Sequence, residues 1–207
     1  TVRDVLGNGV ARVPVMFAAP PGGPSTGLPV SATTDALGVA SVGAIANTVS
    51  GSYTVTATVA HGAEPAVFYL TNLPGAPVSL IPVDGITRTV FMQSTTALTV
   101  SVQDAFGNGV PDVAVTFAAP DSGPSADLSA QTVFVDGSKA ASVTLMSNSA
   151  GMATVFATAN VEAGRYVITA QSSGLGPVNF ELTNVPTHLY LPHVVRPVAP
   201  PKPDLVG

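Results

Sequence analysis

A series of four sequence blocks occurs twice in this chain of 207 residues, and this repeat limits the folds that the chain can adopt. Four blocks of the first half return in the second half: residues 4–10 as 104–110, 13–20 as 113–120, 51–57 as 164–170, and 70–74 as 182–186. The period leaves each copy enough residues for one small domain. The sequence therefore predicts two tandem units of the same fold.

Within these blocks, apolar residues alternate with polar ones. Val113, Val115 and Phe117 fall on one face of an extended chain, and so do Tyr166, Ile168 and Ala170. The chain also holds 20 glycines and 19 prolines, which interrupt the apolar runs at short intervals. Short strands broken by turns at this spacing are typical of a β-sandwich. We therefore expect an all-β chain without sustained helices.

The repeated motif resembles a known family. Residues 104–110 read Asp-Ala-Phe-Gly-Asn-Gly-Val, an apolar lead-in precedes them at 97–103, and Gly-x-Tyr-x-Val/Ile-Thr-Ala occurs at 51–57 and 164–170. This set is similar to the bacterial immunoglobulin-like (Ig-like) repeats of the invasin and intimin type. The resemblance implies two tandem Ig-like β-sandwich domains. It also implies an extracellular, cell-surface location, because such repeats serve as rods and stalks of adhesins and surface-layer proteins.

The two units are predicted to be unequal. We place the first unit at residues 1–75 and the second at 76–186, with an extra segment near 131–146 in the second. The second unit has a full apolar lead-in before its Asp104 turn, whereas the first begins three residues before Asp4. The first unit is therefore expected to lack its N-terminal strand and part of the next one. An edge left open in this way, at Val2 and Val5, could accept a strand from elsewhere.

The C-terminal tail, residues 187–207, is a candidate for that strand. Residues 187–195 line up with residues 76–83, which begin the second unit, and a proline-rich extended segment follows them. One hypothesis is that this tail enters the first unit of the next copy, giving a head-to-tail homopolymer. The donor side chains would be Leu189, Tyr190, Leu191, Val194 and Val195.

A second hypothesis needs no polymer. The chain could instead be a fragment of a longer tandem Ig-like stalk, in an adhesin or surface protein that binds a host or a neighbouring cell. Other surface proteins would then be its partners. Deleting residues 187–207 separates the two hypotheses, because only the filament depends on the tail.

The composition excludes several other roles. Only seven Lys and Arg residues are present and the net charge is −5, so a nucleic-acid partner is not expected. The absence of Cys excludes disulfides and thiol chemistry. No apolar run approaches the length that spans a membrane as a helix.

One catalytic motif matches by letter. Residues 23–27 read Gly-x-Ser-x-Gly, the nucleophile-elbow pattern, but their flanks are loop-like and the repeat copy at 123–127 breaks the pattern. We therefore expect Ser25 to lie in a structural loop and the chain not to be an enzyme.

Neither a cofactor nor a metal is expected. The three histidines are expected to be surface residues, because His61 lies in a glycine-containing turn, and His188 and His193 flank the strand-like tail, five residues apart. Asp4 and Asp104 precede turns and are expected to bind the turn backbone rather than calcium. Phe17, Phe117, Phe156 and Phe180 are predicted to be core residues, and Tyr53 and Tyr166 to brace strands through their hydroxyls.

Overall fold

The computed structural model describes residues 1–60, 64–130 and 140–187, and this part of the chain is all β, as predicted. The strands of the first unit are β1 (Pro14–Ala18), β2 (Thr26–Gly27), β3 (Ser31–Thr33), β4 (Ile45–Ala46), β5 (Gly51–Val59) and β6 (Ala66–Asn72). Those of the second unit are β7 (Ser79–Pro82), β8 (Thr87–Phe91), β9 (Thr95–Gln103), β10 (Ala114–Ala118), β11 (Ala126–Ser129), β12 (Ser142–Met146), β13 (Met152–Ala159), β14 (Gly164–Gln171) and β15 (Val178–Val185).

The second unit is a two-layer sandwich. One sheet has the order β12-β10-β14-β15-β8, in which β15 and β8 run parallel, and the other has the order β11-β13-β9-β7. The chain changes sheets between β7 and β8, which is how two consecutive strands come to lie on opposite layers. This arrangement is an Ig-like sandwich, as the sequence predicts.

The first unit repeats only part of this plan. Its main sheet has the order β3-β1-β5-β6, the counterpart of β12-β10-β14-β15. Opposite it, the described residues form a single two-stranded sheet, β2-β4, with two residues in each strand. No counterpart of β7 or β8 lies within residues 1–60 and 64–75.

A dense core fills the second unit. The side chains that alternate inward along its strands are fully buried, including Leu98, Val155, Phe117 and Phe180. Burial of each such side chain contributes roughly 1.5–3 kcal/mol. Period-two alternation thus directs one apolar row of each strand into the space between the layers.

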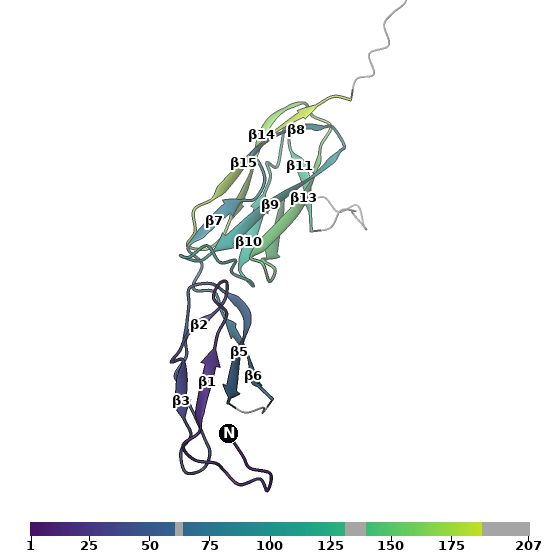
Figure 1. Cartoon of the computed structure of the whole chain (residues 1–207). Helices are drawn as coiled ribbons and strands as arrows, with labels where there is room; N and C mark the ends of the chain where they lie inside the picture. The colour runs from purple at the N-terminus through teal and green to yellow at the C-terminus, as the bar shows by residue number, and fades with distance from the viewer. Residues whose placement is uncertain (61–63, 131–139, 188–207) are drawn as a thin grey trace, which may run out of the picture.

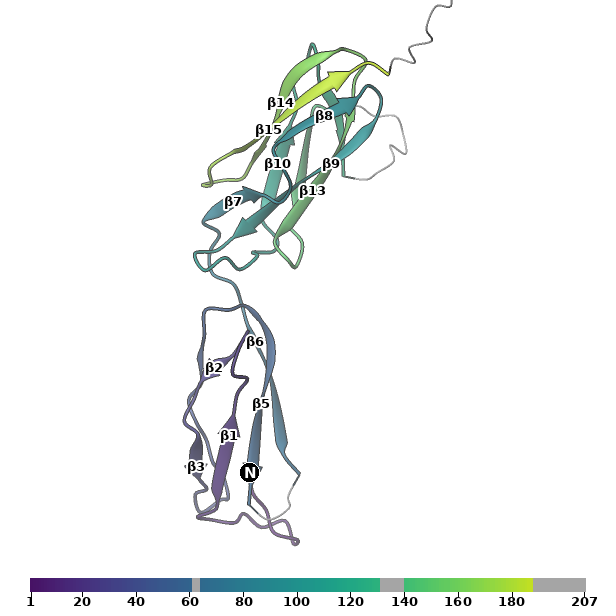
Figure 2. The ribbon, with the colours of Figure 1, turned by 45° about the horizontal axis from the view of Figure 1, so that its top comes forward.

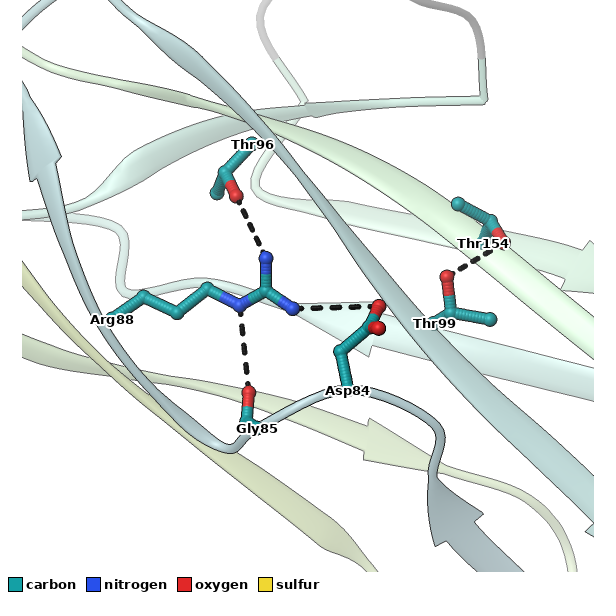
Figure 3. Close-up of polar contacts among 6 residues, drawn as sticks. All are labelled: Asp84, Gly85, Arg88, Thr96, Thr99 and Thr154. Carbon is teal, nitrogen blue, oxygen red and sulfur yellow. Dashed lines mark hydrogen bonds and ion pairs between the residues drawn. The ribbon is translucent and has the colours of Figure 1, made fainter.

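Hydroxyl pairs take the place of charges on the outer faces. Thr95 bonds Thr158 across β9 and β13 at 2.8 Å, and Thr99 bonds Thr154 at 3.0 Å on the same strands. Arg88 on β8 donates to Thr96 Oγ1 and pairs with Asp84 at 3.4 Å, tying β8 to β9 (Figure 3). Each cross-strand pair of this kind contributes roughly 0.2–1 kcal/mol.

The two units are arranged end to end (Figures 1 and 2). Thr1 and the loop that follows it lie at the end of the first unit away from the second, and β15 ends at the far end of the second unit. The chain is therefore elongated, with its first residue and Val185 toward opposite ends. In the described residues we find no helix that is long and apolar enough to cross a membrane.

Candidate functional site

The inner face of the first unit is open. Phe68 on β6 is 47% exposed, whereas Phe180, which holds the same place on β15, is 0% exposed. Phe17 is half-buried, although its counterpart Phe117 is completely buried. The same apolar side chains are thus present in both units, but only the second unit covers them.

Strand β9 of the second unit, which has no full counterpart in the first, explains the difference. In that unit, β13 pairs with β9 from Met152↔Ser101 to Thr158↔Thr95. The matching stretch of the first unit, residues 39–45, has no such partner among the described residues, and within it only Ile45 is in a strand. Because a strand needs a neighbour for its backbone groups, this stretch remains irregular.

Residues 1–3 occupy the last positions of a strand that corresponds to β9. Val2 N–H donates to Gly38 O at 2.8 Å, as Val102 N–H donates to Gly151 O at 2.8 Å. Val10 N–H donates to Val2 O just as Val110 N–H donates to Val102 O. Val2 therefore holds the place of Val102, near the end of a β9-type strand.

The uncovered face is hollow. It contains a cavity of about 290 Å³ with a mainly apolar lining: Phe17, Leu28, Ala40, Ser41, Val42, Ala44, Val55, Phe68 and Leu70. A second hollow beside it includes Thr1, Val2 and Phe68. An extended chain with alternating apolar side chains fits such a surface.

The predicted strand-exchange residues are placed as follows. Val2 lines the second hollow, and both of its backbone groups are bonded within the unit. Val5 lies in the Asp4 turn and its side chain is fully exposed. The proposed donors, Leu189, Tyr190, Leu191, Val194 and Val195, lie outside the described residues, as do most of the predicted extra segment and the three histidines.

The junction between the units is built on the Asp104 turn. We call residues 104–109 the junction turn. Asp104 Oδ1 accepts hydrogen bonds from Phe106 N–H and Asn108 N–H at 2.8 and 2.9 Å, which close the turn as the sequence predicts. Its other oxygen, Oδ2, accepts from Asn108 Nδ2 and from Gly75 N–H in the linker, each at 2.8 Å. The carboxylate thus joins the turn to the linker.

Asn108 connects the same turn to the first unit. Its Nδ2 donates to Thr48 O at 2.8 Å, and its Oδ1 accepts from Ser50 N–H at 2.9 Å. We call residues 47–50 the near corner. The junction turn therefore binds the linker and the near corner together, and from the first unit and the linker it uses only backbone groups.

These contacts also set the charge state of the carboxylate. The hydrogen bond from the Asn108 side chain, together with those from Gly75, Asn108 and Phe106 N–H, lowers the pKa of Asp104 to about 2. Asp4, at the same place in the first unit, has a lowered pKa through its own bonds to Asn8, Leu6 and Gly7. Both turns therefore carry an ionised carboxylate at neutral pH.

Close crossing of two backbone segments holds the junction turn in place. A Cβ on Gly109 would overlap the backbone of Ala150 and Gly151, and one on Gly151 would overlap Gly109 and Val102. Gly151 also has φ +76°, a conformation that suits glycine. Gly9 and Gly38 repeat the arrangement in the first unit.

The corners are braced by asparagines that repeat in both units. Asn47 Oδ1 accepts from Ser25 N–H and Val49 N–H, each at 3.2 Å, and from Asn72 Nδ2 at 3.0 Å.

In the second unit, Asn160 Oδ1 accepts from Ser125 N–H and Glu162 N–H, each at 3.2 Å, and from Asn184 Nδ2 at 3.0 Å. We call residues 160–163 the far corner, which lies on the second unit as the near corner lies on the first. The internal repeat aligns Asn72 with Asn184, but it predicts neither their part in bracing the corners nor the role of Asn108 in the junction.

Ser25 lies in a loop, as predicted, and the last two residues of the motif, Thr26 and Gly27, form β2. The hydroxyl of Ser25 is buried and donates to Pro20 O at 2.6 Å, and Ser125 repeats this bond with Pro120 O. The hydroxyl is therefore part of the loop's own framework. Among the residues that the structure describes, no three His, Cys, Asp or Glu side chains gather in a way that could hold a metal.

The predictions that Phe17 and Phe156 lie in the core need correction, because both side chains are half-buried. Phe117 and Phe180 are core residues, but Phe156 is half-buried and lies on the face of β13 opposite to Val155. The Tyr166 ring is buried, and its hydroxyl lies beside the Asn184 side chain on the neighbouring strand β15. Burial raises the pKa of Tyr166 to about 12, partly offset by the neighbouring Asn184 side chain.

Several solved structures are similar to this chain. No family model and no curated protein matches the chain. Among solved structures, the Yersinia pseudotuberculosis adhesin InvE matches 88% of this chain and 51% of its own, with 21% identity and a TM-score of 0.39. The D0-D1 domain of intimin matches 87% of this chain and 86% of its own, with 21% identity and a TM-score of 0.32.

Surface-layer proteins are also similar. Domains 4–9 of surface layer protein SbsC match 91% of this chain and 25% of their own, with 16% identity and a TM-score of 0.42. A β-glycosidase from Bacteroides vulgatus matches as well. The chain thus spans about half the length of the adhesin that it matches.

Proposed function

We propose that this chain is a segment of a stalk on the outside of a bacterial cell, in which Ig-like units act as a spacer. The observation that carries this proposal is the junction, where Asn108 and Asp104 fasten the second unit to the near corner and the linker. Domains in one chain move relative to one another unless specific contacts hold them. A spacer needs a fixed direction from unit to unit, and these bonds supply one.

The sequence supports the same placement. The repeated Asp-x-x-Gly-Asn-Gly turn resembles that of invasin- and intimin-type repeats, which serve as surface stalks. Both units contain alternating strands and a cross-strand hydroxyl pair, such as Ser52–Thr71 in the first and Thr95–Thr158 in the second, and the chain has no Cys. In this proposal neither unit is catalytic, and attachment to a host or a neighbouring cell is a property of the wider surface protein.

A second candidate, the head-to-tail filament, has one observation in its favour. The open face of the first unit presents Phe17, Phe68 and a cavity of about 290 Å³ to an incoming strand. In this candidate the tail residues from Leu189 to Val195 of one copy fill the face of the next. Strand addition of this kind satisfies backbone groups and apolar pockets together.

The register of the open face weighs against that donor. The tail lines up with residues 76–83, which contain β7, and β7 pairs only with β9 in its own sheet. In the first unit the uncovered position lies beside residues 39–45, where a β9-type strand belongs. A β7-like tail would therefore lack the neighbour that β7 needs, which makes the stalk the better proposal.

Small-angle X-ray scattering and sedimentation can separate the two candidates. The stalk proposal predicts an elongated monomer whose dimensions do not change with concentration. Deleting residues 188–207 should leave its mass and length distribution intact, apart from the missing tail. Growth into linear particles that disappears with this deletion would instead establish the filament. Labelling of intact cells with antibodies against the second unit tests the surface location.

A further inference from the structure

The junction turn has a copy in the first unit that contacts no corner among the described residues. We call residues 4–9 the free turn. Asp4 Oδ1 accepts from Leu6 N–H and Asn8 N–H, each at 2.9 Å, and Asp4 Oδ2 accepts from Asn8 Nδ2 at 3.1 Å. These are the bonds that close the junction turn. The two turns are therefore folded alike before any neighbour is considered.

The free turn has one added bond, from Arg3 Nη1 to Gly7 O at 2.6 Å, and its outer groups have different contacts from those of the junction turn. Asn108 is half-buried against the near corner, whereas Asn8 is exposed. Asp104 is 4% exposed beneath the linker, and Asp4 is exposed. The Asn8 amide and the outer oxygen of Asp4 thus present the three groups that Asn108 and Asp104 use at the junction: one donor and two acceptors.

We propose that the free turn is the receiving half of a second junction, and that it binds the corner of a further Ig-like unit joined ahead of it in the same polypeptide. The inference rests on the proposed stalk. In the docked state, Asn8 Nδ2 donates to a corner carbonyl, Asn8 Oδ1 accepts a corner N–H two residues later, and Asp4 Oδ2 accepts a linker N–H.

The chemistry of the partner follows from the observed junction. Thr48 O, Ser50 N–H and Gly75 N–H are all backbone groups, so a partner must match the corner in fold and not in side chains. The far corner has the same asparagine brace with different residues, which makes this shape a property of the repeat. The linker position is tolerant too, because a Cβ on Gly75 would lie 3.5 Å from Asp104 Oδ2, an ordinary contact.

The partner must be linked because the contact is small. Three hydrogen bonds do not offset the loss of translational and rotational freedom of two free chains. A covalent link raises the effective concentration of the corner and removes most of that cost. The open face adds a second requirement, since the strands that run from the corner to Thr1 are the ones that would cover Phe17 and Phe68.

A chimera made only of this chain's own sequence tests the proposal. Residues 1–100 are fused directly ahead of the full chain 1–207, so that β7, β8 and most of β9 lead into Thr1 in their natural register. Residues 1–3 then take the places of residues 101–103, and the leading near corner faces the free turn. The chimera thus holds one new junction and one native junction, which serves as an internal reference.

In the chimera, we follow Asn8 of the 1–207 part, which comes after the new junction. We expect its side-chain amide to exchange slowly with solvent there and rapidly in the full chain alone, as measured by NMR. In the chimera, Asn8→Ala should loosen the new junction only, and Asn108→Ala the native junction only. Leu6→Ala is the matched control, because its counterpart Phe106 remains 67% exposed in the formed junction. This control should leave both junctions unchanged.

Two outcomes overturn the proposal. One is a folded chimera in which Asn8 exchanges as fast as in the full chain while Asn108 remains protected. The other is a chimera in which the grafted strands do not pair with residues 39–45. In either case the native junction, and with it the stalk proposal, can remain intact. Loss of protection at Asn108 in the full chain would count against the stalk itself.

Discussion

At the scale of single residues, the repeat supplies its own controls. Phe68 and Phe180 occupy matching places in the two units, yet one is half exposed and the other completely buried. The difference comes from the covering layer and not from the residue. Matched substitutions in the two units therefore measure the open face directly.

The first prediction uses this pair. Phe180→Ala should cost about 3–5 kcal/mol of stability in the second unit, as large-to-small changes in a packed core do. Phe68→Ala should cost the first unit much less, about 1 kcal/mol, because its ring is already partly in water. Urea titration followed by NMR signals from each unit measures both values. Equal costs would show that the open face is covered in solution.

A second prediction concerns alkaline pH. Burial raises the pKa of Tyr166 to about 12, above the ordinary value of 10.0 that it recovers on unfolding. The stabilising effect is therefore fully present below pH 10 and is lost as the pH rises toward 12. Unfolding of the second unit at several pH values between 9 and 12 tests this. Tyr166→Phe should remove this part of the decline, and an unchanged decline would rule out Tyr166 as its cause.

At the scale of elements, the sequence predicts much of the fold and little of the junction. Alternation along residues 113–117 and 164–170 predicts strands, and β10 and β14 contain all of these residues except Val113. Phe156 shows where this reasoning stops, because an aromatic residue in a strand can point to either face. The junction bonds join Asn108 to Thr48 and Ser50, and no local pattern indicates which distant backbone groups a side chain will reach.

The open face leads to a third prediction, about the order in which the elements lose protection. Amides of β5 and β6 should exchange with solvent faster than those of β14 and β15, because one side of the first sheet lacks a second layer. Hydrogen exchange followed by NMR resolves the four strands. Similar protection of the two pairs would contradict the difference in burial between the units.

At the scale of the whole molecule, the junction decides whether the chain is a rod or two linked domains. Its charge state gives a fourth prediction. The pKa of Asp104 is lowered to about 2 from 3.8, so its stabilising effect is fully present above pH 3.8 and is lost as the pH falls through 2. The junction should therefore loosen near pH 2. Asp104→Asn should loosen it at neutral pH as well, because an amide has one acceptor oxygen, whereas Asp104 closes the turn with Oδ1 and accepts from Asn108 Nδ2 and Gly75 N–H with Oδ2.

The rod itself is tested most directly by residual dipolar couplings from both units in one aligned sample. We expect a single alignment tensor to fit both units of the full chain. Asn108→Ala removes the bonds to Thr48 and Ser50 and should give two tensors of different magnitude while each unit remains folded. Two different tensors in the unmodified chain would mean that the units tumble separately, and the chain could not then serve as a rigid spacer.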